Sequence, residues 1–140
     1  MVIDQGAPLE ILRGTVLYIE DDPVNMTVVE AALSRHPGIV LLQAATGREG
    51  VRLARAEHPD LVLLDMHLPD IGGLEVVREL NEEIAAGRLR VILLTGDTLS
   101  PDIVKAMSLG AHGYWLKPID NATLETALRR ALGHKVETPR

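Results

Sequence analysis

Short apolar runs alternate five times with segments of helical periodicity, and this alternation constrains the fold of the 140-residue chain more than any other feature. The third and fourth runs, residues 61–64 and 91–94, are apolar throughout. Strands without polar alternation are buried on both faces, as in a parallel sheet covered by helices. We therefore expect an α/β fold with a doubly wound parallel sheet and right-handed crossovers. The predicted strands are residues 16–19, 39–42, 61–64, 91–94 and 113–116.

Capping signals mark the helices between these runs. Polar side chains that can accept from the first backbone N–H groups of a helix stand at four predicted starts: Asp22, Thr46, Ser100 and Asp120. One helix carrying Leu74, Val77 and Ile84 is expected to end at Gly87, and Val104 is expected to face inward on the next helix. We expect one domain over residues 14–133, with tails at residues 1–13 and 134–140.

Composition excludes several functional classes. The chain has no cysteine, which excludes disulfides, thiolate zinc sites and cysteine nucleophiles. The formal net charge of −6 has the wrong sign for bulk attraction to nucleic acid, and few aromatic rings are present to stack on bases. No apolar run approaches the roughly 20 residues of a membrane span, and no signal peptide is visible. We therefore expect a cytoplasmic protein that binds neither nucleic acid directly nor a membrane.

Polar side chains follow four of the five predicted strands. Glu20 and Asp21 come after the first strand, Asp65 after the third, Thr95 after the fourth and Lys117 after the fifth. In open parallel sheets, ligands bind at the carboxyl ends of the strands, where the winding reverses direction. If the first and third strands are neighbours, the three acids converge in one crevice, flanked by the threonine and the lysine.

Three carboxylates in one crevice would repel one another, and a divalent cation would remove that conflict. An all-oxygen site with room for water suits Mg²⁺. Lys117 adds a positive charge and Thr95 a hydroxyl donor, and an Asp carboxylate can form a mixed anhydride with phosphate. The set matches the needs of phosphoryl transfer. The plainer interpretation, acids on a solvated edge beside an ordinary surface lysine, stays open for each residue taken alone.

Four motifs resemble the receiver domain of response regulators from bacterial two-component and phosphorelay systems. They are VLYIEDDPVN (16–25), DLVLLDMHLP (60–69), LLTG (93–96) and Lys117-Pro118, in the family's order and spacing. The resemblance covers about residues 14–133. It implies a (βα)5 flavodoxin-like receiver fold with strand order 2-1-3-4-5 and a cis bond between Lys117 and Pro118.

The resemblance also implies a role for each matching residue. Asp65 corresponds to the phosphate-accepting aspartate, and Lys117 to the lysine that contacts the phosphoryl group. The implied Mg²⁺ ligands are Glu20, Asp21, Asp65 and the backbone carbonyl of His67. Thr95 and Tyr114 correspond to the switch pair. His67, Gly96 and Asp97 occupy positions that tune the lifetime of the phosphoryl group.

A receiver would take its phosphoryl group from a histidine kinase or phosphotransfer domain, promote its own dephosphorylation and switch an interaction surface. The resemblance places that surface on the fourth helix, the fifth strand and the fifth helix, for a homodimer or an output partner. One alternative is a phosphatase of the haloacid dehalogenase type, which needs an aspartate where this chain has His67. Others are a flavodoxin-like electron carrier and an interaction module that is not phosphorylated.

Overall fold

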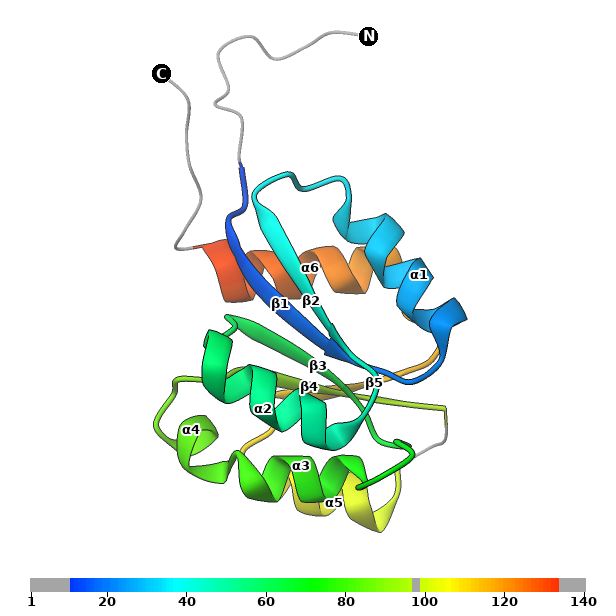
Figure 1. Cartoon of the computed structure of the whole chain (residues 1–140), viewed down its shortest axis with the longest axis vertical. Helices are drawn as coiled ribbons and strands as arrows, with labels where there is room; N and C mark the ends of the chain where they lie inside the picture. Colours follow the sequence, from blue (N-terminus) through cyan, green and yellow to red (C-terminus); the bar gives the residue numbers. More distant parts are fainter. Residues whose placement is uncertain (1–10, 97–98, 134–140) are drawn as a thin grey trace, which may run out of the picture.

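A computed structural model describes residues 11–96 and 99–133. Its five strands pair in parallel in the order β2-β1-β3-β4-β5, which confirms the predicted doubly wound sheet (Figure 1). Each strand lies where the apolar runs predict it, and several extend one or two residues further. The strands are β1 (Gly14–Ile19), β2 (Ile39–Ala44), β3 (Leu61–Asp65), β4 (Val91–Thr95) and β5 (Gly113–Leu116).

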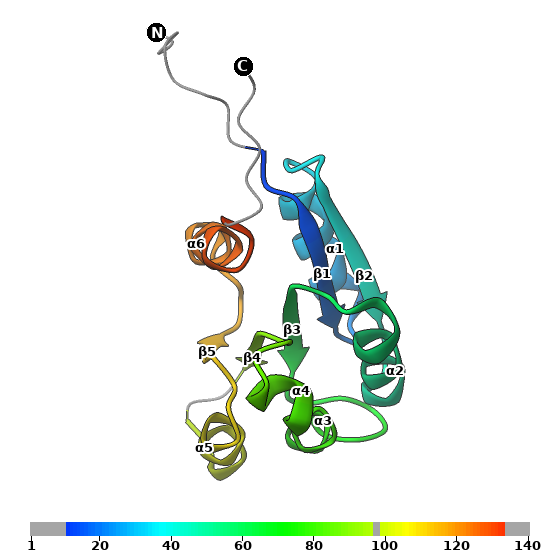
Figure 2. The ribbon, with the colours of Figure 1, turned by 90° about the vertical axis from the view of Figure 1, so that its left-hand side faces the viewer.

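Helices cover both faces of the sheet. One face carries α1 and α6, and the other carries α2, α3, α4 and α5 (Figure 2). The helices are α1 (Pro23–Leu33), α2 (Gly47–Glu57), α3 (Gly73–Glu79), α4 (Asn81–Ala85), α5 (Pro101–Ser108) and α6 (Asn121–Leu132). All residues of β3 and β4 are buried, as their uninterrupted apolar sequences predict.

Alternate residues of each central strand supply two separate apolar clusters. In β3, Val62 and Leu64 pack with α2, α3 and α5, whereas Leu61 and Leu63 pack with α1 and α6. Leu12, which lies in the segment expected to be a tail, is also buried in the second cluster. Two clusters on opposite faces hold the strands in register and so fix where their carboxyl ends lie.

All four predicted capping side chains cap their helices. Asp22 accepts from the backbone N–H of Val24 at 2.8 Å, and the other three accept from the third residue beyond them. A further cap comes from a distant loop: the carboxylate of Asp70 accepts from the N–H groups of Gly47 and Arg48, at 2.8 and 2.9 Å. This contact ties the loop after β3 to the start of α2.

Two predictions about helices are wrong. The single helix expected to reach Gly87 is divided at Leu80, whose backbone (φ −95°, ψ 10°) leaves the helical region. Leu80 and Ile84, on either side of this division, pack in the same apolar cluster. Val104 faces outward with 52% of its surface exposed, and Ala106 takes the buried position on α5.

Within residues 11–96 and 99–133, no helix has the length and apolar character needed to cross a membrane.

Candidate functional site

The polar residues that follow the strands meet at one edge of the sheet. Glu20 directly follows β1, Asp65 ends β3, Thr95 ends β4 and Lys117 directly follows β5. Backbone hydrogen bonds continue past the strand ends, since the N–H of Lys117 donates to the carbonyl of Thr95 at 2.8 Å and that of Met66 to Leu94 at 3.0 Å. The extended ladder holds these side chains in place at the carboxyl edge.

Glu20 is a buried carboxylate with four hydrogen-bond donors around it; 2% of its surface is exposed. Its Oε1 accepts from Lys117 Nζ at 2.8 Å, from the Tyr18 hydroxyl at 3.0 Å and from Asn25 Nδ2 at 3.2 Å. Its Oε2 accepts from the backbone N–H of Asp22 at 3.3 Å. Burial raises the pKa of Glu20, but donation from Lys117 and the other donors outweighs it and lowers the pKa to about 2.

Asp65 is equally buried but has fewer donors. Lys117 Nζ lies 3.1 Å from its Oδ1, and the backbone N–H of His67 donates to the same oxygen at 3.2 Å. Burial, followed by the neighbouring Glu20, raises the pKa of Asp65 to about 6. Without a metal, the fold therefore disfavours the charge on Asp65 and favours the charge on Glu20.

Lys117 bridges the carboxylates of Glu20 and Asp65, because its Nζ contacts an oxygen of each. Burial lowers the pKa of its ammonium, but the hydrogen bond to Glu20 and the charge of Asp65 outweigh burial and raise it. The amine is therefore charged at neutral pH. It brings together groups from β1, β3 and β5, which are separated by up to 97 positions in the sequence.

The acidic cluster fits a divalent cation. Glu20, Asp21 and Asp65 each offer one carboxylate oxygen, and these oxygens lie within 4.8 Å of one another. Asp21 is exposed and the other two are buried, so the cluster has one side open to solvent. In proteins, Mg²⁺ is typically bound by carboxylate oxygens and keeps several water ligands, which requires access to solvent. The three residues could therefore hold Mg²⁺.

The remaining predicted residues differ in burial and in position. Thr95 is buried and lines a hollow of about 280 Å³ together with His67 and the start of α5. Gly96 is exposed beside it, and Tyr114 is 40% exposed on β5. Asp97, expected to tune the phosphoryl lifetime, lies outside the described residues. The Lys117–Pro118 bond is cis, as predicted.

Comparison with known sequences identifies the family. The sequence model of the response regulator receiver domain matches residues 16–129. The chain belongs to this family. As a receiver, it is a phosphoacceptor domain of two-component signalling, and the phosphatase, electron-carrier and unphosphorylated-module alternatives find no support.

The relatives differ in how much of their own length this chain covers. The nitrate/nitrite response regulator protein NarL of Escherichia coli K12 is 36% identical over 118 residues, which are 84% of this chain and 54% of NarL. Protein PilH of Pseudomonas aeruginosa is 34% identical over 117 residues, which are 84% of this chain and 96% of PilH. The receiver thus spans about half the length of NarL but nearly all of PilH.

The solved structures similar to this chain include a receiver with bound magnesium. The receiver domain of the sensor histidine kinase PA1611 from P. aeruginosa has a TM-score of 0.75 and 33% identity, over 86% of this chain and 98% of that chain. Its crystal structure has a magnesium ion coordinated in the active-site cleft. A CheY-like receiver from Methanospirillum hungatei has a TM-score of 0.77 and 25% identity, over 88% of this chain and 96% of its own.

Sequence reasoning missed two residues that support the acidic cluster. Tyr18 is fully buried in β1 and donates to Glu20; burial, then the charge of Glu20, raises the pKa of its phenol. Asn25 donates to the same carboxylate from α1. A tyrosine in an otherwise apolar strand is the available signal, because a buried hydroxyl needs a partner and the nearest polar residue is Glu20.

Proposed function

We propose that Asp65 accepts the phosphoryl group of this receiver. The observation that carries the proposal is the 3.1 Å contact between Lys117 Nζ and Asp65 Oδ1, beside three carboxylate oxygens within 4.8 Å. An acceptor carboxylate needs an adjacent cation and a metal site because the incoming phosphoryl group is itself negatively charged. The proposed Mg²⁺ ligands are Glu20, Asp21, Asp65 and the backbone carbonyl of His67.

The residues of the crevice account for the transfer. A carboxylate oxygen of Asp65 attacks the phosphorus of a partner's phosphohistidine; the new P–O bond forms as the P–N bond breaks, and the imidazole leaves with the partner. Lys117 neutralises charge on the phosphoryl oxygens, and the N–H of His67 holds the carboxylate in place. Bound Mg²⁺ would neutralise the acidic cluster and polarise the phosphoryl oxygens.

We propose that Thr95 and Tyr114 report the phosphorylation to the surface. The Thr95 hydroxyl would move toward the phosphoryl group, and Tyr114 would turn inward from its half-exposed position. The surface concerned is formed by α5, β5 and α6, where Val104 and Leu116 are 52% and 53% exposed. Such exposed apolar side chains suit a homodimer contact or an output partner. Phosphorylation would shift the population between two existing conformations of this surface.

The partners and lifetime of the phosphoryl group are further parts of the proposal. The donor would be a histidine kinase or a phosphotransfer domain, and the receiver unit would span residues 14–133. The receiver would promote its own dephosphorylation, with His67, Gly96 and Asp97 tuning the approach of water to the acyl phosphate. The cytoplasmic location expected from the sequence stays a prediction.

Intact-mass spectrometry after incubation with Mg²⁺ and acetyl phosphate tests the proposal. The wild type is expected to gain one phosphoryl group, and Asp65→Asn to gain none. Asp120→Asn is the matched control, since asparagine caps a helix as well as aspartate does and Asp120 caps α6 outside the cluster. Undiminished phosphorylation of Asp65→Asn would refute the assignment.

A further inference from the structure

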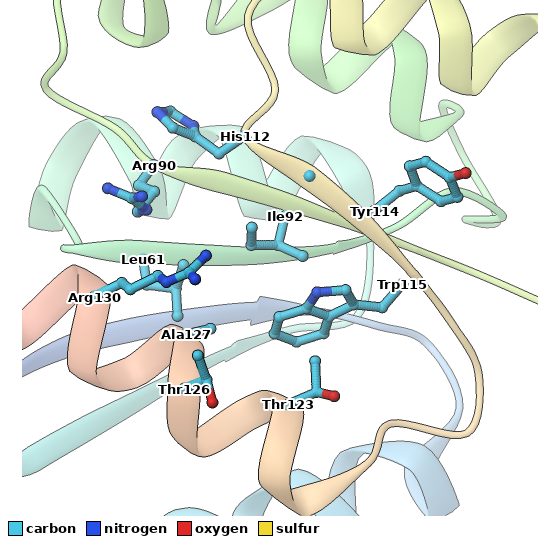
Figure 3. A pocket seen from close by; sticks show the side chains of 11 residues that line it. Leu61, Arg90, Ile92, His112, Tyr114, Trp115, Thr123, Thr126, Ala127 and Arg130 are labelled. Carbon is cyan, nitrogen blue, oxygen red and sulfur yellow. The ribbon is translucent and has the colours of Figure 1, made fainter.

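A second hollow, of about 350 Å³, lies between α6 and β5, the edge strand of the sheet (Figure 3). Leu61, Ile92 and Trp115 form its apolar wall. Arg90 and His112 line it from the positions just before β4 and β5, at the amino ends of these strands. The acidic cluster lies at the carboxyl ends, so the two sites occupy opposite ends of the same strands.

Positive charge gathers at one end of this hollow. The side chains of Arg90 and Arg130 lie near each other there, whereas Trp115 lies toward the other end (Figure 3). No carboxylate lines the hollow, and within residues 11–96 and 99–133 neither arginine forms an ion pair or a side-chain hydrogen bond. Two guanidinium groups with no partner among the described residues, in a chain of net charge −6, make this end of the hollow suitable for an anion.

His112 lies at the edge of the hollow, with its imidazole pointing away from Arg130 and Trp115 (Figure 3). Its Nδ1 accepts from the backbone N–H of Val91 at 3.2 Å, which leaves Nε2 to carry the ring proton. Burial, followed by the charge of Arg90, lowers the pKa of His112, so the imidazole is neutral at pH 7. The guanidinium groups of Arg90 and Arg130 together offer enough N–H donors for the three terminal oxygens of a phosphate group.

We propose that this hollow binds a small molecule in which a phosphate group is joined to a flat ring system, of about the size of a nucleoside monophosphate. The phosphate would lie between Arg90 and Arg130, and the ring would pack along Trp115 and Ile92. The volume is at the lower end of the roughly 300–1,000 Å³ typical of small-molecule sites. Trp115 precedes Lys117 by two positions, so a ligand held here contacts the strand that leads into the phosphorylation site.

Fluorescence offers a direct assay because Trp115 is the single tryptophan of the chain. Titration of the full chain with adenosine monophosphate is expected to change its emission saturably, and calorimetry should give the same dissociation constant. Arg90→Gln and Arg130→Gln should each weaken binding about tenfold or more, the effect of losing a hydrogen bond to a charged group. Arg129→Gln is the matched control, since it removes the same charge from the preceding position of α6 and Arg129 does not line the hollow.

Three results would overturn the proposal. They are no saturable change at millimolar adenosine monophosphate, equal affinity in both arginine variants that remain folded by circular dichroism, and binding of adenosine as tight as that of the monophosphate. Inorganic phosphate should bind more weakly than the nucleotide, and equal affinity would refute the ring contact. Asp65→Asn should bind the nucleotide as the wild type does, so this test is independent of the phosphoacceptor assignment.

Discussion

The ionised carboxylate of Asp65 should destabilise the receiver when no metal is bound, and Asp65→Asn should therefore stabilise the metal-free protein. Asp65 is 2% exposed, and its pKa is raised from 3.8 to about 6 by burial and by Glu20. A rise of that size corresponds to about 3 kcal/mol of unfavourable free energy at pH 7. Because asparagine keeps the shape but loses one partner of Lys117, we expect a net gain of about 1–3 kcal/mol.

The stability difference between Asp65→Asn and the wild type should depend on pH. Between pH 3.8 and about 6, the folded state binds more protons at Asp65 than the unfolded state does. The contribution of Asp65 to the free energy of unfolding should therefore fall as the pH rises through this window. Asp65→Asn lacks this titration, so its advantage should be present above about pH 6 and should vanish below about pH 4.

Urea denaturation in the presence of a chelator measures the difference. The curves of wild type and Asp65→Asn should be compared at several pH values, and then again with excess Mg²⁺. Metal that binds only the folded wild type should raise its stability and reduce the difference. A metal-free Asp65→Asn that is less stable than the wild type at pH 7 would show that Lys117 compensates fully for the burial of both carboxylates.

Three other substitutions test the scaffold around the site, each by urea denaturation. Gly50→Ala should cost about 1–3 kcal/mol, because a Cβ on this face of α2 would collide with the side chain of Ile19; unchanged stability would mean that β1 and α2 separate freely. Leu80→Ala should lower the free energy of unfolding by about 2–5 kcal/mol, since Leu80 is fully buried at the bend between α3 and α4. A loss as small as that expected for an exposed residue would contradict this burial. Asp70→Asn should destabilise the protein at neutral pH. Burial raises the pKa of Asp70, but the N–H groups of Arg48 and Gly47 outweigh it and hold the pKa at about 2; the difference should disappear as the pH falls through that value, and a difference that persists there would exclude the charge as its cause.

The placement of the acidic cluster follows from the sequence because it depends on strand ends alone. Parallel strands of known order bring their carboxyl ends to one edge, so Glu20, Asp65 and Lys117 had to meet there. The hydrogen bond from Tyr18 to Glu20 is harder to predict, because an apolar run does not show which hydroxyl reaches which carboxylate. The sequence predicts the existence of this site better than its internal hydrogen bonds.

Features set by packing could not be read from periodicity. The bend at Leu80 leaves the spacing of apolar residues helical, so one continuous helix was the natural prediction. Val104 and Ala106 are both apolar, and only the packing of α5 shows that the smaller one is buried. The hollow beside Trp115 joins Arg90 to Arg130, 40 positions away, and requires the pairing of β4 with β5 and the placement of α6.

The most direct test of the central claim is to map the phosphoryl group to one residue. The receiver would be phosphorylated with acetyl phosphate and Mg²⁺, reduced with borohydride to convert the acyl phosphate to an alcohol, and digested for peptide mass spectrometry. We predict that the reduced residue is Asp65, and that a chelator abolishes the modification. Modification at Asp21, the exposed member of the same cluster, or an equal yield without metal would contradict this account.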